Sequence, residues 1–536
     1  MHTPTDEQAH AVDVFRDGDH LVLQAGAGTG KTSTLGMLAA STGRRGRYLA
    51  FNKDIARDAT AHFPNSVQCK TAHATAYAAL GHRFVRRLNS PRQPAWRIGN
   101  ALGIDSSVSI GDHEISHRTL SHAVLRTVTR FCHSADRALA PHHVPMLRRL
   151  EAEDEWSQLS DAVMPFAVKA WHDLQNPERG VVRFEHDHYL KMWALTDPKI
   201  EADFLLLDEA QDTNPVLEQV FAAQRAHAQL VMVGDSAQAI YGWRGARDVM
   251  TGFEAVHLTL TRSFRFGPAL AEEANRWLSF TKAPIRLTGT DEIPTEIGVV
   301  TSPDAVLCRT NIGAVTEVMR LLTAGHRVAL TRGGQTLTGL ALAAQNLKEG
   351  RCTSHPELAL FSSWGELQDY ASYDPAGRDL QPFVELVDTY GPQAIIAAVG
   401  ALTDEHSADV TVSTAHKAKG REWPRVRIAG DFPQPSDADQ NDDCGRSIPA
   451  PVNETDARLA YVAVTRARRR LDLGGLSWIE NHPALEVVVS KSSKGKDVCD
   501  GGLCASTQTG HGHAGRDGHA GRCRRPRPPR PTPPAA

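Results

Sequence analysis

The chain has 536 residues, of which 41% are hydrophobic and 23% are charged, and its 59 Lys and Arg against 62 Asp and Glu give a formal charge of −3. This length is too great for one hydrophobic core, so we expect several globular domains. No apolar run approaches the roughly 20 residues that cross a bilayer, and the N-terminus lacks a basic-then-apolar signal. These features argue against a membrane partner and predict a cytoplasmic location.

The first predicted elements run from about Asp19 to Pro64 as strand, turn, helix, strand and helix. Leu21–Leu23 and Tyr48–Phe51 are apolar strand-like runs, and a Gly-rich segment follows the first. Such a segment between a strand and a helix turns its N–H groups onto phosphate oxygens. Lys31 would meet the β- and γ-phosphates, and the Thr32 hydroxyl would ligate Mg²⁺. The pattern predicts an ATP-binding P-loop made of Ala25, Gly26, Ala27, Gly28, Thr29, Gly30, Lys31 and Thr32.

Two acidic residues follow the next predicted strand. Residues 81–190 are mostly helical in pattern and polar, and two further apolar runs, Phe204–Leu207 and Leu230–Val233, come after them. Asp208 and Glu209 stand directly behind the first run, at the carboxyl end of a strand, where nucleotide sites of parallel sheets are built. We expect Asp208 to hold Mg²⁺, and Glu209 to orient and deprotonate the attacking water.

A second series of strands predicts a second α/β domain with a parallel sheet. A helical segment at about 345–400 interrupts it, and beyond about Pro483 a basic tail rich in Pro and Gly predicts disorder. The eight cysteines are scattered, and we expect reduced thiols; the Cys and His residues of the tail have a spacing that fits no metal module. The strands of this second series are Ala305–Cys308, Val328–Leu330, Val410–Ser413, Val426–Ile428 and Leu471–Leu473.

Blocks from Gln8 to Arg466 resemble, in the family's order, the motifs of superfamily 1 DNA helicases of the UvrD/Rep/PcrA group. The most specific block is Gly234–Ala246, and Ser413–Glu422 and Ala460–Ala467 match two later motifs. The resemblance implies two RecA-like P-loop domains, each with a helical insertion, and a disordered C-terminal tail. The implied boundaries are 1–80 and 191–258 for the first domain, 81–190 for its insertion, 259–344 and 401–482 for the second domain, 345–400 for a reduced second insertion, and 483–536 for the tail.

The same resemblance implies further contacts to ATP. Gln8 would recognise the adenine edge, and Phe264 would stack on the base, although the family commonly has Tyr there. Glu422 would hold the ribose. The γ-phosphate would meet three residues with roles in hydrolysis, namely Gln238, Arg265 and Arg466.

Contacts to single-stranded DNA are implied at two early motifs, at the most specific block and at Ser413–Glu422, which matches the family's fifth motif. Trp243 would stack on a base, because every base offers a π-face; the alternative is a core tryptophan beside the nucleotide. A structural histidine is an equally open interpretation of His73. The implied DNA contacts are Phe51, Asn52, Thr71, His73, Trp243 and His416.

The resemblance therefore implies an ATP-dependent helicase or translocase that moves 3′ to 5′ on single-stranded DNA and at junctions of single- and double-stranded DNA, with replication or recombination proteins as possible partners. The short second insertion resembles the phage-type and F-box-helicase-like relatives, and it keeps open a second hypothesis, an ATPase that strips protein–DNA complexes without processive unwinding. A third hypothesis is a nucleotide switch with no role on DNA, which leaves the later motifs unexplained.

Overall fold

The structure is a computed structural model whose described residues end at His482. The predicted tail and Trp243 lie outside the described residues. The described ranges are 3–88, 90, 95–147, 150, 152–240, 248–331, 334–353, 355, 357–358, 361–373, 380–435, 437–441, 447–449 and 451–482.

The first sheet has six parallel strands in the order β3-β2-β6-β7-β1-β8. Its four inner strands contain the four predicted runs, except that Phe51 lies one residue beyond β2. The strands are β1 (Leu21–Ala25), β2 (Gly46–Ala50), β3 (Val67–Thr71), β6 (Phe204–Leu207), β7 (Gln229–Gly234) and β8 (Val256–Leu260).

Alternating side chains of the first sheet enter two separate hydrophobic clusters. Leu206 and Val231 pack with the helices α1 (Asp6–Asp17), α2 (Lys31–Ala40) and α3 (Lys53–Thr60). The residues adjacent to them in each strand, Leu205 and Met232, pack on the opposite face with α4 (Ala72–Ala79) and α10 (Pro215–Ala222). Because both faces are covered, the inner strands are mostly apolar, as expected of a parallel sheet.

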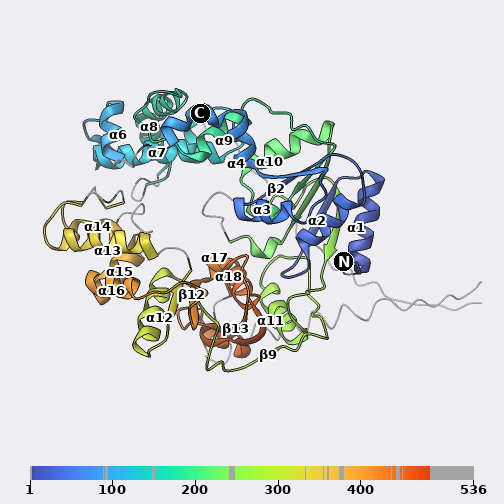
Figure 1. The fold of residues 1–536 in the computed structure, drawn as a ribbon. Coiled ribbons are helices and arrows are strands. Elements are labelled where there is room, and N and C mark those ends of the chain that lie inside the picture. Colours follow the sequence, from blue (N-terminus) through green and yellow to red (C-terminus); the bar gives the residue numbers. More distant parts are fainter. Residues whose placement is uncertain are drawn as a thin grey trace, which may run out of the picture. The chain divides into compact units, whose positions relative to one another are not determined.

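Helices inserted between β3 and β6 share the second of these clusters. Phe131 and Val163 lie in the same continuous core as Leu49 and Leu205 of the sheet. Figure 1 shows the ribbons of the inserted helices gathered together, coloured from blue to blue-green. The inserted elements are η1 (Gly81–Phe84), α5 (Val85–Leu88), α6 (Ala95–Leu102), the hairpin β4 (Val108–Ile110) and β5 (His113–Ile115), α7 (His117–His133), η2 (Pro141–His143), α8 (Glu153–Leu174) and α9 (His186–Ala194).

The second sheet is also parallel and six-stranded, in the order β11-β12-β10-β13-β16-β9. The five predicted runs of this half fall in five of its strands, with Leu473 just beyond β16. The α/β class with two parallel sheets and many helices is thus confirmed. The strands are β9 (Glu296–Ile297), β10 (Ala305–Cys308), β11 (Val328–Leu330), β12 (Val410–Thr414), β13 (Trp423–Ile428) and β16 (Ala467–Asp472).

Helices cover both faces of the second sheet, and a separate helical cluster follows β11. One face packs α11 (Pro268–Leu278), α17 (Ala415–Ala418) and α18 (Glu454–Val464), and the other packs α12 (Asn311–Thr323). The hydrophobic core of this helical cluster also includes Val315 of α12. The cluster contains α13 (Gly334–Lys348), α14 (Trp364–Tyr373), α15 (Gln381–Tyr390) and α16 (Pro392–Gly400).

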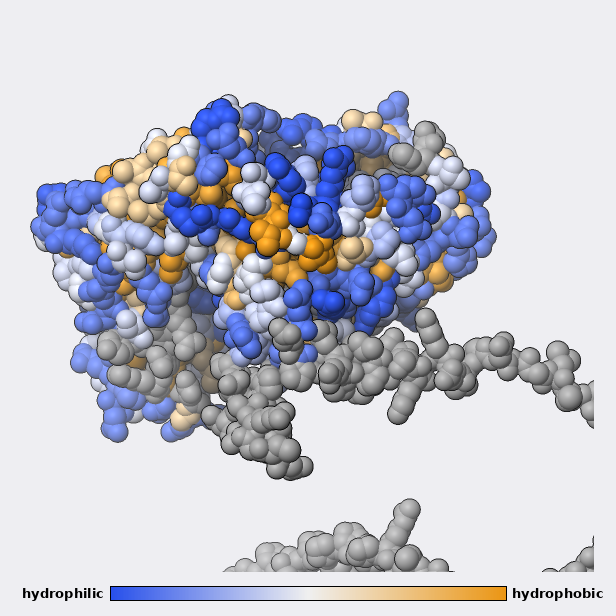
Figure 2. Space-filling model, turned by 90° about the horizontal axis from the view of Figure 1, so that it is seen from below, coloured by the Kyte–Doolittle hydropathy of each residue, from blue (hydrophilic) through white to orange (hydrophobic). Residues whose placement is uncertain are grey.

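The remaining elements are short. They are η3 (Ala210–Asp212), η4 (Ala223–Ala226), η5 (Ser236–Gln238), the pair β14 (Asp437–Asn441) and β15 (Ser447–Pro449), and η8 (Gly474–Asn481). The face drawn in Figure 2 is mostly hydrophilic and is interrupted by a smaller hydrophobic patch. Among the described residues, no helix combines the length and the apolar composition that crossing a bilayer requires.

Candidate active site

The Gly-rich segment forms the turn between β1 and α2, as predicted. Gly28 and Gly30 have φ of 77° and 78°, in the left-handed region that favours glycine. The Thr29 hydroxyl donates to Gly26 O at 3.0 Å and closes the turn. Gly30 is the N-cap residue of α2 and supplies no side chain there, so the first turn of the helix is left open to an anion.

The two predicted Mg²⁺ ligands meet at the start of α2 and the end of β6. Thr32 Oγ1 donates to Asp208 Oδ2 at 3.2 Å, and the Tyr48 hydroxyl donates to the same oxygen at 2.5 Å. Burial, followed by the charge of Glu209, raises the pKa of Asp208. Oxygen atoms such as Thr32 Oγ1 and the Asp208 carboxylate are the ligands that Mg²⁺ prefers. A bound cation would also balance the negative charge of the buried carboxylate. The residues present therefore fit the metal.

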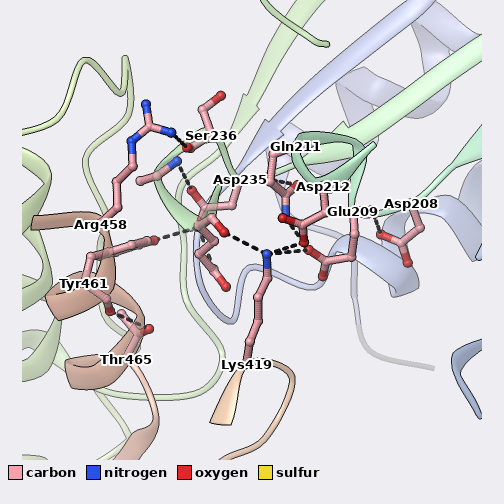
Figure 3. A network of polar contacts seen from close by, with 12 residues as sticks. Asp208, Glu209, Gln211, Asp212, Asp235, Ser236, Lys419, Arg458, Tyr461 and Thr465 are labelled. Carbon is pink, nitrogen blue, oxygen red and sulfur yellow. Dashed lines mark hydrogen bonds and ion pairs between the residues drawn. The ribbon is translucent and has the colours of Figure 1, made fainter. Parts of the chain in front are cut away.

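Glu209 lies beside a buried ammonium group from the second sheet's half of the chain. Gln211 Nε2 donates to Glu209 Oε2 at 2.5 Å, and Lys419 Nζ lies 3.9 Å from the same oxygen (Figure 3). Burial acts to raise the pKa of Glu209, but Lys31 and Lys419 outweigh it and hold the pKa below its usual range. The carboxylate is thus ionised and held in place. The backbone of Glu209 has φ of 52°, in the left-handed region. This conformation is strained for residues other than glycine, and such strained residues are frequent at functional sites.

Lys419 joins the two halves more closely than the sequence predicted. Its ammonium donates to Asp212 Oδ2 and, at 2.7 Å, to Gln238 O (Figure 3). Asp212 is buried, and its Oδ1 has no hydrogen-bond partner among the described residues. Burial outweighs the attraction of Lys419 and raises the pKa of Asp212 to about 6. Because Lys419 belongs to the fifth motif, it ties that motif to the acidic end of β6.

Tyr461 forms a second link between the halves that the sequence did not single out. Its hydroxyl accepts from Ala27 N in the P-loop at 3.0 Å and donates to Asp235 Oδ2 at 2.8 Å. Gln238 Nε2 donates to the same carboxylate oxygen at 2.7 Å. A residue of α18 therefore contacts the phosphate loop and, through Asp235, the predicted γ-phosphate contact Gln238. Figure 3 shows the hydrogen bond between Tyr461 and Asp235.

The segment that carries Arg265 contacts the P-loop directly. Phe264 N donates to Gly28 O at 2.8 Å, and Ser263 Oγ donates to Ala27 O at 2.9 Å. This segment follows β8, the edge strand of the first sheet. Arg265 therefore lies between β8 of the first sheet and α11, which packs on the second sheet.

Arg265 is paired with another predicted ATP contact. Its Nε donates to Glu422 Oε2 at 2.6 Å, and its NH1 donates to Thr465 O at 3.0 Å. The structure thus places the predicted ribose contact Glu422 against this arginine, which also reaches the residue before Arg466. Neither group of the ion pair is fully buried, so both are accessible to a ligand.

Arg466 is almost completely buried, with 1% of its surface exposed. Among the described residues its guanidinium donates to oxygens without formal charge, namely Val462 O at 2.8 Å, Arg421 O at 3.2 Å and Thr465 Oγ1 at 2.9 Å. Burial and the neighbouring Arg265 lower the pKa of Arg466 to about 9. A buried arginine without a carboxylate partner is well suited to receive an anionic phosphate.

A cavity of about 550 Å³ lies beside Phe264. Gln8, the predicted adenine contact, is buried, and its amide is engaged within the chain: Oε1 accepts from Thr5 N at 3.1 Å and Nε2 donates to Thr34 Oγ1 at 3.0 Å. The Phe264 ring and several polar side chains line this cavity. The same ring lies 3.6 Å from the position of a Cβ built on Gly30, so the cavity is close to the P-loop. Its lining residues are Thr3, Pro4, Thr5, Asp6, Glu7, Thr261, Arg262 and Phe264.

Four of the predicted DNA contacts lie at the carboxyl ends of the neighbouring strands β2 and β3. Phe51 is exposed, whereas Asn52 and Thr71 cap α3 and α4 by accepting from Ile55 N and Ala74 N. His73 Nε2 lies 2.9 Å from Asp187 Oδ1, so this ring already has a structural partner. His416 lies apart from them, on α17 of the second sheet's half, and Trp243 is outside the described residues.

Gly28→Ala should weaken ATP binding by about tenfold or more. A Cβ at this position would lie 2.6 Å from both Arg265 Cβ and Ser263 Oγ, and the left-handed φ adds strain. Gly18→Ala is the matched control, because Gly18 has φ of 94° and no atom lies within 4 Å of the place that an added methyl group would occupy. Titration with a fluorescent ATP analogue measures the effect, and equal affinities for the two variants would contradict it.

Asp212→Asn should change how stability depends on pH. Since folding raises the pKa of Asp212 to about 6 from an ordinary value near 4, the folded state binds more protons, and its stability falls as the pH rises through this range. Between pH 4 and pH 7 the wild type should lose about 2 kcal/mol that the variant keeps. Denaturant unfolding at both pH values measures this difference, and parallel pH profiles would contradict it.

Comparison with known proteins finds helicase family models in both halves of the chain. Residues 184–253 match the UvrD/REP helicase N-terminal domain, and residues 368–478 match the UvrD-like helicase C-terminal domain. The F-box DNA helicase protein 1 of Schizosaccharomyces pombe is 28% identical over 509 residues, covering 88% of this chain and 57% of the relative. F-box DNA helicase 1 of Gallus gallus is 28% identical over 85% of this chain and 47% of the relative. The chain therefore spans about half the length of these relatives.

A bacterial relative is matched over more of its own length. The ATP-dependent DNA helicase UvrD2 of Mycobacterium tuberculosis is 26% identical over 571 aligned positions, covering 88% of this chain and 78% of the relative.

Proposed function

Because this chain belongs to the UvrD-like helicase family, we propose that it is an ATP-driven DNA helicase or translocase that moves 3′ to 5′ on single-stranded DNA. The proposal rests on one observation: side chains from the second sheet's half of the chain contact the P-loop and the neighbouring carboxylate Glu209. Tyr461 contacts Ala27, and Lys419 lies beside Glu209. A nucleotide bound at this point touches both halves, which is what a motor requires.

In hydrolysis, the P-loop amides and Lys31 would bind the phosphates, and Thr32 and Asp208 would hold Mg²⁺. When bound, Mg²⁺ would supply positive charge that screens the phosphate oxygens. Glu209 is ionised and fixed by Gln211, so it can accept a hydrogen bond from the attacking water and orient it. The buried carboxylates at the end of β6 support the roles proposed for Asp208 and Glu209.

Arginines then couple the nucleotide to movement. Arg265 and Arg466 carry positive charge at the boundary between the halves, and in the ATP complex both would turn toward the γ-phosphate. Loss of that phosphate removes their shared anion, so the attraction that closes the halves weakens. DNA held by base stacking, which tolerates any sequence, would move by a small step with each cycle.

Strand displacement with defined overhangs tests the proposal. ATPase activity should rise when single-stranded DNA is added, and a duplex with a 3′ overhang should be unwound in preference to one with a 5′ overhang. A preference for the 5′ overhang would reverse the polarity. ATPase activity that does not respond to DNA would favour a nucleotide switch.

The small second insertion favours one alternative, a DNA-stimulated ATPase that strips proteins from DNA without processive unwinding. Among the described residues, the predicted insertion at 345–400 contains the end of α13 and the helices α14, α15 and α16, whose buried side chains share one hydrophobic core. Removal of a recombinase filament from single-stranded DNA, measured beside strand displacement, separates the two functions. Filament removal without unwinding would support the alternative, and replication or recombination proteins would then be the partners.

A further inference from the structure

Three side chains with metal-binding atoms converge in the loop that follows α7, within the first helical insertion. Asp136 Oδ2 lies 2.7 Å from His142 Nε2 and 2.9 Å from His143 Nε2. The three ligand atoms all lie within 4.8 Å of one another. The two histidines are consecutive on η2, and their ring centroids are 4.1 Å apart. None of the three belongs to the nucleotide site.

No lysine or arginine among the described residues pairs with the Asp136 carboxylate. The neighbouring Arg137 pairs with Asp197 instead. The buried Lys191 comes close, but its ammonium donates to backbone oxygens, Ser134 O at 2.7 Å and Asp136 O at 2.5 Å. The carboxylate therefore faces two imidazoles, the pair of ligand types from which zinc sites are commonly built.

The backbone of this loop is fixed from two helices. Arg130 of α7 donates to Val144 O at 2.9 Å and to His142 O at 3.2 Å. Lys191 of α9 holds the carbonyls at the other end of the loop. His143 is buried, with its ring edge-on to Phe131 at 5.4 Å between centroids. A loop held in this way brings its ligand atoms together before any ion arrives.

We propose that Asp136, His142 and His143 bind one divalent transition-metal ion of the zinc class. Metal–ligand distances near 2.0–2.1 Å in a tetrahedral site place donor atoms about 3.3 Å apart, so the Asp136 oxygen would move away from each imidazole nitrogen by about 0.5 Å. The two nitrogens, which lie within 4.8 Å of each other, would settle at the same spacing. Asp136 and His142 are exposed and free to rotate by that amount.

The buried histidine also has the second contact that metal-bound histidines usually make. His143 Nδ1 lies 3.0 Å from both Ala140 N and Ala140 O, and Nε2 lies 3.1 Å from Ser134 Oγ. In the tautomer whose Nδ1–H donates to the carbonyl, Nε2 can bind the metal in place of Ser134 Oγ. Water would complete the tetrahedron on the exposed side. The ion would join an exposed loop to a histidine in the core of the inserted helices.

Titration of the full chain with Zn²⁺ tests this site. Wild-type protein should bind one equivalent more than His142→Ala, or bind that equivalent at least about tenfold more tightly. His62→Ala is the matched control, because His62 is an exposed histidine whose Nδ1 contacts only the Asp58 carbonyl. Zn²⁺ should also raise the thermal midpoint of the wild type more than that of His142→Ala. Equal stoichiometry and affinity in the wild type and His142→Ala would overturn the proposal.

Co²⁺ distinguishes this site from the tail, whose three cysteines could also bind zinc. A site of two imidazoles and one carboxylate should give visible Co²⁺ bands without the thiolate charge-transfer band that cysteine ligands produce. These bands should disappear in His142→Ala and in Asp136→Asn. The second variant keeps an oxygen that can accept from the histidines, so it serves if the first fails to fold. Co²⁺ bands that persist in both variants, or that always include the thiolate band, would overturn the proposal.

Discussion

Glu209→Gln should lower DNA-stimulated ATP turnover by about two to four orders of magnitude while ATP binding is retained. The substitution keeps the size and the hydrogen-bonding reach of the side chain, and it removes the negative charge that accepts from the attacking water. Lys31 and Lys419 keep this carboxylate ionised in the wild type. The neutral amide therefore removes the group that orients water and leaves the phosphate contacts in place.

Steady-state turnover with saturating single-stranded DNA measures this effect, and a fluorescent nucleotide measures binding. Glu201→Gln makes the same chemical change on an exposed carboxylate just before β6, and its turnover should stay at the wild-type level. Near-normal turnover in Glu209→Gln would remove this residue from the chemistry. Loss of nucleotide binding together with turnover would instead assign it to ATP binding.

Arg265→Ala should reduce turnover by about three orders of magnitude, the size of effect expected of an arginine that stabilises charge on a transferring phosphate. Arg265 is only partly buried and is paired with Glu422, so its removal leaves no buried cavity of consequence. Arg466 is a poorer choice for this test because it is buried and holds three oxygens of the chain. A substitution of Arg466 would therefore lower both the stability of the fold and the turnover, and the two effects could not be separated.

The control for this prediction is another arginine–carboxylate pair on the surface. Arg327 pairs with Asp409 in the second sheet's half, and Arg327→Ala should keep wild-type turnover. Thermal midpoints of both variants show whether either is unfolded. A loss of less than about tenfold for Arg265→Ala would mean that this side chain does not reach the phosphate.

The sequence predicted the inner strands because they are buried on both faces. Runs such as Phe204–Leu207 and Ala305–Cys308 are apolar at every position, and each is a strand with those bounds. The edge strands β3 and β8 were missed for the opposite reason. Their side chains alternate between buried and exposed positions, so Lys70 and His257 interrupt the apolar pattern.

At the candidate site, the residues named by motif came together, but their partners could not be predicted. Lys419 and Tyr461 stand inside recognised motifs, yet their contacts with Asp212 and Ala27 join positions about 200 and more than 400 residues apart in the chain. Nothing in local pattern specifies such pairings, which arise only when two sheets pack together. The only sign of these contacts in the sequence was that Lys419 and Tyr461 stand inside motif blocks without an assigned role.

The core shared by the first sheet and its inserted helices affects how the chain can be divided. Val22, Leu49 and Leu205 of the sheet pack in one cluster with Val163 and Phe131 of the insertion. Excising residues 81–190 would therefore uncover an apolar sheet face, and the truncated protein should aggregate instead of serving as a minimal motor. A usable minimal version has to replace these side chains with polar ones, or keep the helices that cover them.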